Sequence, residues 1–594
     1  MKALRLLLGL PLLLTACSSA PPAKPATLPR NDYSYLKTYL NWLIKDEMSR
    51  QAIEGLSIAV VDDQQIVWAQ GFGFADSANK IPATSETVYR MGSISKLFTD
   101  TLVMQLAEQG RLSIDQPLQT YLPEFSIKTR FPEAGPITPR NIMTHHSGLP
   151  GDIGNGMWTQ TPKPIEQLVG QLKDEYVANP PNTIWSYSNL GLTMLGVAVE
   201  QMTGKDFNTY ANEQLLQPLG MINARFAQTL GGTKAAKAYK IHEEKAEVPL
   251  RDTPAGGLNA SVTDMSQFIK MVFADGKANG RQILKPETLK EMLRPQNNTV
   301  ALDLDFRIGL GWMLRDNLNM GMIAEHGGAT LYHQSQLSLV PEHKLGVIVA
   351  TNSRPLGDLL IKISNAALKL AVSAKTGNTL AMDEEQPVIK TRPFTEAELQ
   401  KAAGQYATLF GYVKLTPKTN GLVADIDGNT VDFVAREDGR IGIRYKLFGF
   451  IPIQPKELAD VSMSLRTVAG RDLVLAHYNG QTFVAGEKIT PAAIPASAHQ
   501  WLGEYDIVNL AGGDALVPQQ CAISEKDGFL MVNYSLPELD KNNLSFPISL
   551  INANEAVILG LGRGFQETIR ALKINGEAHI ASSGYLLRKR PMKE

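Results

Sequence analysis

Ser93 and Lys96 stand three residues apart in the stretch VYRMGSISKLFTDTLVMQLAEQG. Apolar residues at helical spacing follow them and Gly110 ends the pattern, so the sequence predicts a helix from Ser93 to Gln109. Residues three apart on a helix are neighbours, and a buried lysine can lose its proton readily enough to activate a hydroxyl. The pair therefore has the chemistry of an activated nucleophile, although a serine that only caps a helix gives the same pattern.

Two later segments carry polar groups that suit the same chemistry. Tyr187 and Asn189 lie in a turn just before an apolar helix, where a phenol can carry a proton and an amide can hold a substrate carbonyl. His326-Gly327-Gly328 leads into an edge-strand pattern, along which a substrate could lie with its carbonyl facing an N–H group. Each segment also has a purely structural explanation. Tyr187 could be an aromatic packed under a loop, and the two glycines after His326 could serve a strand entry with unusual dihedral angles.

In order and spacing, the three segments resemble those of the serine β-lactamase and penicillin-binding protein family. They are most similar to its class C-like branch, which includes family VIII esterases and D-amino-acid peptidases. The resemblance covers about residues 35 to 372. Further similar stretches are TSETVYRMGSISK, NIMTHHSGLP, PAGGLNASVTDMSQFIKMV, IGLGW and VIVATNS.

The resemblance implies a division of catalytic work. Ser93 would be the nucleophile that forms an acyl-enzyme, while Lys96 and Tyr187 would share the general-base and general-acid roles. The sequence leaves open which of the two takes the first proton. Acyl transfer of this kind needs no metal and no organic cofactor.

The resemblance also implies a set of binding groups. The oxyanion hole would consist of backbone N–H groups of Ser93 and Ala329, next to Gly328. Asn189 would orient the bound carbonyl, and His326 would line the cleft from the strand side. The paired histidines of THHSGLP, His145 and His146, have no matching catalytic role and are interpreted as structural.

The third segment departs from the family pattern. β-Lactamases and cell-wall transpeptidases usually carry Lys-Thr-Gly there, and its cation meets the substrate carboxylate. A neutral His326 would hold that carboxylate more weakly, although a protonated one could still bind it. The change favours an esterase or an aminopeptidase-like amidase over a β-lactamase or a D-Ala-D-Ala carboxypeptidase.

Helix and strand patterns at the two ends of residues 31 to 375 predict the frame of this domain. A helix over 31–50 and a hairpin over 58–69 open it, whereas a strand pair ending at 340 and 350 and a helix over 357–372 close it. This order predicts an α/β fold in which an antiparallel sheet is flanked by helices. A largely helical insertion would run from about 86 to 315.

The composition changes after Ala374. A polar, aperiodic linker over 376–394 precedes short strand-like runs broken by Gly, Asn and Asp. The stretches AAGQYATL and WLGEYDI both carry Gly-x-Tyr, which suggests two β-rich, barrel-like modules over 395–490 and 495–594. Two unrelated coincidences would give the same pattern, and no catalytic chemistry stands out in this region.

The N-terminal MKALRLLLGLPLLLTACSSA has the build of an export signal and is too short to span a bilayer. Its LTAC ending resembles a bacterial lipoprotein processing site, which implies cleavage after residue 16 and acylation of Cys17. Ser18 favours the outer membrane, and residues 17–30 would form a Pro-rich tether. A plain secretory signal is the alternative. With Cys17 acylated, Cys521 has no partner for a disulfide.

The bulk composition narrows the function classes. The 594 residues hold 58 basic and 59 acidic side chains, and this balance gives no field that would attract nucleic acid. The sequence therefore predicts a lipid-anchored serine hydrolase that acts on small esters, or on peptides and amides related to the cell wall. A catalytically weak binding protein and a surface adhesin remain as alternatives, and the oligomeric state is left open.

Overall fold

The computed structural model describes residues 20–25, 29–355, 357–378, 380–381, 389–419, 421–426, 429–447, 451–453, 461–478 and 481–591. The predicted signal peptide and Cys17 lie outside these residues. The described part of the Pro-rich segment packs on the domain, since Tyr35 donates to the Pro22 carbonyl and Lys24 to the Leu380 carbonyl, both at 3.3 Å.

An eight-stranded antiparallel sheet forms the centre of the first domain, in the order β11-β12-β13-β14-β15-β1-β2-β3. Strands from the two ends of the domain lie side by side, because Ile58 of β1 pairs with Val349 of β15. The strands are β1 Gly55–Asp62, β2 Gln65–Asp76, β3 Ile81–Pro82, β11 Arg307–Ile308, β12 Met313–Asn317, β13 Gly321–Ala329, β14 Gln334–Val340 and β15 Leu345–Thr351.

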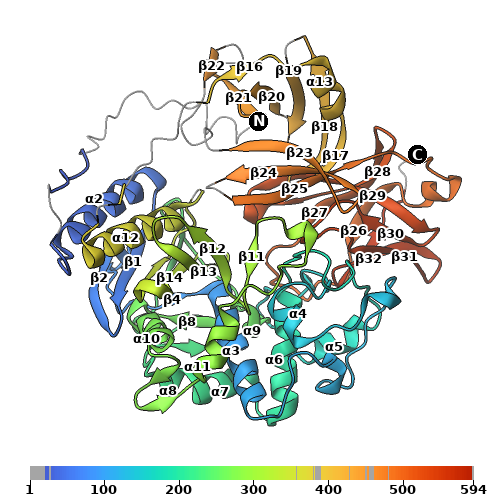
Figure 1. Cartoon of the computed structure of the whole chain (residues 1–594). Coiled ribbons are helices and arrows are strands. Elements are labelled where there is room, and N and C mark those ends of the chain that lie inside the picture. The colour runs from blue at the N-terminus through green and yellow to red at the C-terminus, as the bar shows by residue number, and fades with distance from the viewer. Residues whose placement is uncertain are drawn as a thin grey trace.

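The two faces of this sheet bury different elements. Successive side chains of a strand point to opposite faces, so Ile58 and Val60 join one core while Ala59 and Val61 join the other. The first face is covered by the helices α2 (Ser34–Gln51) and α12 (Leu359–Thr376), which lie next to each other in Figure 1. The first and last helices of the domain therefore share one face, as the sequence predicts.

The opposite face carries the helical insertion. Its core includes Phe98, which stacks on Phe268 with ring centroids 4.4 Å apart. The helices are α3 Ser95–Glu108, α4 Pro139–Met143, α5 Gln167–Leu172, α6 Asn189–Thr203, α7 Phe207–Ala211, α8 Gln217–Leu219, α9 Thr253–Gly256, α10 Val262–Phe273 and α11 Pro286–Met292. The short strands are β4 Tyr89–Arg90, β5 Arg225–Phe226, β6 Ala238–Lys240, β7 Glu243–Lys245, β8 Leu258–Ala260, β9 Lys277–Ala278 and β10 Arg281–Gln282.

Two eight-stranded barrels follow the helix α13 (Glu396–Ala402), and Figure 1 shows the first in gold to orange at the top and the second in orange to red at the right. Pairing of β20 with β21 and of β17 with β25 closes the first barrel, with β16 and β22 added to it. Its strands are β16 Thr391–Arg392, β17 Gly404–Thr408, β18 Gly411–Lys418, β19 Gly421–Ile426, β20 Asn429–Arg436, β21 Ile441–Leu447, β22 Ile451–Ile453, β23 Ser462–Val468, β24 Arg471–Tyr478 and β25 Gln481–Ile489.

The second barrel closes through the pairing of its first and last strands, β26 and β33. Its strands are β26 Gly503–Ile507, β27 Gln519–Lys526, β28 Phe529–Leu536, β29 Lys541–Asn552, β30 Glu555–Ile558, β31 Thr568–Ile574, β32 Glu577–Ser582 and β33 Tyr585–Lys589. The predicted fold class, an α/β domain with an antiparallel sheet followed by barrel-like modules, is thereby confirmed.

The two barrels begin in the same way. Tyr406 in β17 and Tyr505 in β26 are both buried, and each hydroxyl donates to the carbonyl four residues earlier, that of Ala402 at 2.8 Å and that of Trp501 at 2.6 Å. The glycine two residues before each tyrosine has φ near +140°. The repeated Gly-x-Tyr of the sequence thus corresponds to one local structure used twice.

Two features are absent from the described residues. No helix there combines the length and apolar character needed to cross a bilayer. No group of three or more His, Cys, Asp or Glu side chains within the same residues is arranged to hold a metal ion. Cys521 is present as a free thiol.

Candidate active site

Ser93 lies in a tight turn between β4 and α3. The turn is a short 3₁₀ segment, Gly92–Ile94, and the α-helix begins at Ser95, slightly later than the sequence predicts. Gly92 has φ +52°, and a Cβ atom there would lie 2.6 Å from the Ala329 nitrogen. Glycine at this position therefore allows the turn that carries Ser93 to contact the end of β13.

The end of β13 is open on one side. Pairing of β12 with β13 stops at Glu325, whereas β14 pairs with β13 up to Ala329, so the backbone from His326 to Ala329 has a strand on one side only. A Cβ atom at Gly328 would lie 1.9 Å from the Met91 carbonyl oxygen. These close approaches put the Ala329 backbone beside the Ser93 turn, which is the geometry that a two-donor oxyanion hole needs.

Lys96 contacts the Ser93 hydroxyl directly. Its Nζ is 3.1 Å from Ser93 Oγ and donates to the Ala255 carbonyl in α9 at 2.8 Å. The side chain is only 1% exposed, and burial lowers the pKa of Lys96 to about 7, with the Arg563 cation acting in the same direction. A large share of Lys96 is therefore the neutral amine at neutral pH, and a neutral amine can accept a proton.

Tyr187 completes the cluster. Lys96 Nζ lies 4.8 Å from the Tyr187 ring centroid, and a hydrogen bond joins the Tyr187 and Ser93 side chains. Burial raises the pKa of Tyr187 above its ordinary value despite that bond, so the phenol keeps its proton at neutral pH. The structure thus brings together the hydroxyl, amine and phenol that the sequence singles out.

The turn before α6 holds Tyr187 in place. Ser188 caps this helix, since its side chain accepts from the Gly191 N–H at 2.9 Å, and it also donates to the Pro150 carbonyl at 2.6 Å. The Ser188 N–H donates to His145 Nδ1 at 3.2 Å, and the His145 ring lies 4.1 Å from the Tyr187 ring, centroid to centroid. Burial keeps the pKa of His145 well below its usual range, so this ring is a neutral support for the phenol.

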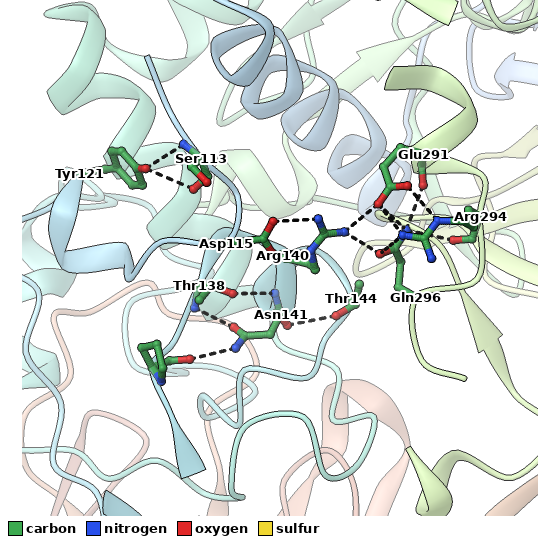
Figure 2. Close-up of polar contacts among 11 residues, drawn as sticks. Ser113, Asp115, Tyr121, Thr138, Arg140, Asn141, Thr144, Glu291, Arg294 and Gln296 are labelled. Carbon is green, nitrogen blue, oxygen red and sulfur yellow. Dashed lines mark hydrogen bonds and ion pairs between the residues drawn. The ribbon is translucent and has the colours of Figure 1, made fainter. Parts of the chain in front are cut away.

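A polar network anchors the segment that carries His145. Figure 2 shows Arg140 of α4 bonded through two nitrogens to Asp115 and through a third to Glu291, at distances of 2.6–2.9 Å. Thr138 and Asn141 form a capping box at the start of α4. His146 lies 2.7 Å from Asp303. This setting fits the structural interpretation of His146, whereas His145 is closer to the site than the sequence indicates.

Asn189 and His326 have partners within the protein. Asn189 Nδ2 donates to Asp152 Oδ1 at 2.8 Å. His326 is 2% exposed and its Nδ1 lies 2.7 Å from the Gly327 carbonyl. Burial, and to a smaller extent the Lys96 charge, lowers the pKa of His326 to about 4. The imidazole is therefore neutral at neutral pH and supplies no cation for a substrate carboxylate.

Three charged residues of the site have no signal in the sequence. Asp152 binds both Asn189 and Arg563, and Glu567 accepts from the Gly151 N–H at 2.8 Å. Arg563 and Glu567 come from the second barrel, more than 400 positions after their partners. A contact over that separation leaves no spacing or periodicity by which it could be recognised.

Comparisons with known proteins identify the family of the chain. The family model described as Beta-lactamase matches residues 40–371. Beta-lactamase-like protein 2 of Dictyostelium discoideum is 23% identical over 436 residues, which are 69% of this chain and 78% of that protein. Protein flp of Staphylococcus aureus (strain N315) is 23% identical over 321 residues, which are 52% of this chain and 62% of that protein.

Solved structures share the fold. The octameric penicillin-binding protein homologue from Pyrococcus abyssi superposes with a TM-score of 0.50 at 23% identity, covering 76% of this chain and 99% of that one. SurE, solved with D-Leu, superposes with a TM-score of 0.53 at 20% identity, covering 76% and 98%. Because the family model spans more than half of the residues, this chain belongs to the beta-lactamase family and is one of its serine hydrolases.

Proposed function

We propose that the protein cleaves small peptides, amides or esters through an acyl-enzyme formed on Ser93. The observation that carries this proposal is the contact of Lys96 Nζ with Ser93 Oγ at 3.1 Å, in a setting that lowers the pKa of Lys96 to about 7. A lysine with that pKa is already partly deprotonated before substrate binds, so it can act as a general base.

The reaction would proceed in two halves. Neutral Lys96 takes the Ser93 proton as the oxygen attacks the substrate carbonyl, and the N–H groups of Ser93 and Ala329 stabilise the oxyanion by roughly 3 kcal/mol each. Tyr187 gives its proton to the leaving group and is reprotonated by Lys96. Water then attacks the ester on Ser93, its proton passes to the same bases, and Ser93 regains a hydrogen when the acid leaves.

The charge pattern supports amide and ester substrates over β-lactams. The family's usual cation at the third segment is replaced by His326, whose pKa of about 4 makes it neutral at neutral pH. SurE, a neighbour in fold, is known in a structure with D-Leu, which supports including D-amino-acid derivatives among the candidates.

A parallel substrate screen tests this proposal. We expect p-nitrophenyl esters or amino-acid amides, assayed as D and L isomers, to be hydrolysed by the wild type and not by Ser93→Ala. Nitrocefin is expected to be turned over at well below ~10 s⁻¹, a typical enzyme rate. Nitrocefin hydrolysis at or above that rate would instead assign a β-lactamase.

We propose further that the mature protein is a lipoprotein anchored through Cys17 and facing the periplasm from the outer membrane. The support is the signal-like N-terminus, its LTAC ending and Ser18 after the cysteine. Labelled palmitate supplied to expressing cells is expected to enter the wild type and to be lost in Cys17→Ser. Equal labelling of both proteins, or none of either, would refute the anchor.

A further inference from the structure

The loop between β30 and β31 of the second barrel reaches the catalytic residues. Arg563 Nη2 donates to Asp152 Oδ2 at 2.5 Å, and the guanidinium carbon lies 5.2 Å from the Tyr187 ring centroid. Lys96 Nζ approaches the same ring at 4.8 Å. Arg563 is thus nearly as close to the Tyr187 ring as Lys96 is, although it comes from a different domain.

This loop is held in place by apolar contacts on either side of Arg563. Leu561 is 5% exposed and packs in one cluster with Ile184 and Leu302 of the first domain. Phe565 is 4% exposed and contacts Phe546, with ring centroids 5.9 Å apart. Two buried anchors four residues apart fix the backbone between them, so the position of Arg563 is set by the fold rather than by its own side chain.

The second barrel is also fixed to the side of the site formed by β13. Tyr332, which follows that strand, donates to Glu538, and Lys240 pairs with Asp540 at 2.9 Å. On the Asp152 side, Ser583 donates to the Asp152 carbonyl at 3.1 Å. Contacts on both sides of the catalytic residues mean that Arg563 belongs to a rigidly docked part of the site.

Arg563 keeps unused hydrogen-bond donors. Its side chain is 45% exposed, and Asp152 is the one side chain that it hydrogen-bonds among the residues that the structure describes. A guanidinium has five N–H groups in a planar fork that matches a carboxylate. The Asp152 oxygens, by contrast, already accept from Asn189 and from Arg563, and Glu567 accepts from Gly151. The unused hydrogen-bonding groups of Arg563 are therefore N–H donors, and an anion is the ligand that would accept from them.

We propose that Arg563 binds a carboxylate carried by the substrate at the Asp152 end of the site, which is a different position from that of the cation usual in the third segment. The proposal rests on the hydrolase function proposed above and narrows its substrate class to small acyl compounds whose free carboxylate lies at this end of the site rather than beside His326. His326 is neutral, and burial raises the pKa of Glu567 to about 7, so the charge that opposes an anion beside Arg563 is mainly that of its ion-pair partner Asp152.

Two pairs of substrates test this preference. One pair is the 4-nitrophenyl monoester of glutaric acid and its methyl ester, which place the carboxylate on the acyl side. The other is N-acetyl-dialanine and its C-terminal amide, as D and L isomers, which place it on the leaving side. In at least one pair, the wild type is expected to show the higher kcat/KM for the carboxylate member.

Variants of Arg563 give the decisive comparison. Arg563→Met is expected to lower the ratio of kcat/KM between carboxylate and neutral members by about 10- to 100-fold. Arg563→Lys should retain part of the ratio, and Arg563→Glu should invert it. Gly151→Val keeps the charge but sets a Cβ atom 3.1 Å from Arg563 Cγ, so it should reduce the ratio moderately.

Arg590 offers a matched control on the same barrel. It pairs with Glu504 and Asp506 and is half exposed, so Arg590→Gln removes an arginine while the ratio stays at the wild-type value. Melting temperatures and fluorophosphonate labelling of Ser93 identify any variant that fails to fold. A wild type without carboxylate preference in either pair, or an Arg563→Met that lowers both members equally, would overturn the proposal. A folded wild type that is not labelled by the fluorophosphonate and turns over none of the substrates would overturn the hydrolase function as well.

Discussion

Replacing Ser93 with alanine is expected to lower kcat by a factor on the order of 10³ to 10⁶, because no other group in the site can form the acyl-enzyme. The Ser93 side chain makes its contacts with Lys96 and Tyr187, and it is not part of an apolar core. The change should therefore leave the melting temperature within a few degrees of the wild type. Steady-state kinetics with the best ester or amide from the screen measure the effect.

Ser95→Ala is the matched control for this change. Ser95 is fully buried, and its hydroxyl donates to the Gly92 carbonyl at 2.6 Å and accepts from the Leu258 N–H at 2.9 Å. Its removal should cost about 1–3 kcal/mol of unfolding free energy, because a buried donor is left unsatisfied. The nucleophile itself would remain. Retention of substantial activity in Ser93→Ala would contradict its assigned role.

Lys96→Met is expected to lower kcat by about 10²- to 10⁴-fold, the usual contribution of a general base. The pH profile carries a second signature of the same residue. The pKa of Lys96 is lowered to about 7, so the neutral, proton-accepting form dominates above that pH. The wild-type kcat/KM should therefore rise with pH up to about 7 and then level off.

Two variants separate Lys96 from its neighbours in that profile. Tyr187→Phe lowers kcat, but the rise of kcat/KM with pH (the acid limb of the profile) should still end near pH 7, because the Lys96 amine is unchanged. Arg563→Met should move the limb to higher pH, since the Arg563 charge is one of the causes that lower the pKa of Lys96. An acid limb near the ordinary lysine pKa in the wild type, or an unaltered limb in Lys96→Met, would exclude Lys96 as the base.

Local patterns in the sequence were sufficient to predict the frame of the first domain. The hairpin around residues 58–69 corresponds to β1 and β2, and the closing strands to β14 and β15. Such elements are recognisable because alternating or helical spacing of apolar residues follows directly from their burial on one face. The closure of each C-terminal barrel was harder to predict from the sequence. In the second barrel, for example, the pairing of β26 with β33 joins segments about 80 residues apart.

The candidate site was predictable in part. Ser93, Lys96 and Tyr187 lie in short motifs whose order and spacing carry information, and the structure brings their side chains together. The start of α3 was misplaced by two residues because the tight turn at Gly92, which has a positive φ, has no signature in the sequence. The same limit applies to His145, whose contact with Tyr187 depends on how two loops meet.

Arg563 was not predictable, for a physical reason. Nothing in LGLGRGFQE distinguishes it from any glycine-rich barrel loop until Leu561 and Phe565 are seen packed against their partners. The loop becomes part of a catalytic site only through docking of one domain on another. Residues contributed in this way are visible in tertiary structure and leave no local pattern.

Covalent trapping addresses the assignment of Ser93 most directly. The full-length protein is incubated with a fluorophosphonate at neutral to alkaline pH, digested and analysed by tandem mass spectrometry. We predict one adduct per chain, located on Ser93 within the peptide MGSISK and absent from Ser95. An adduct on a different residue, or none on protein that is folded by circular dichroism, would contradict Ser93 as the nucleophile.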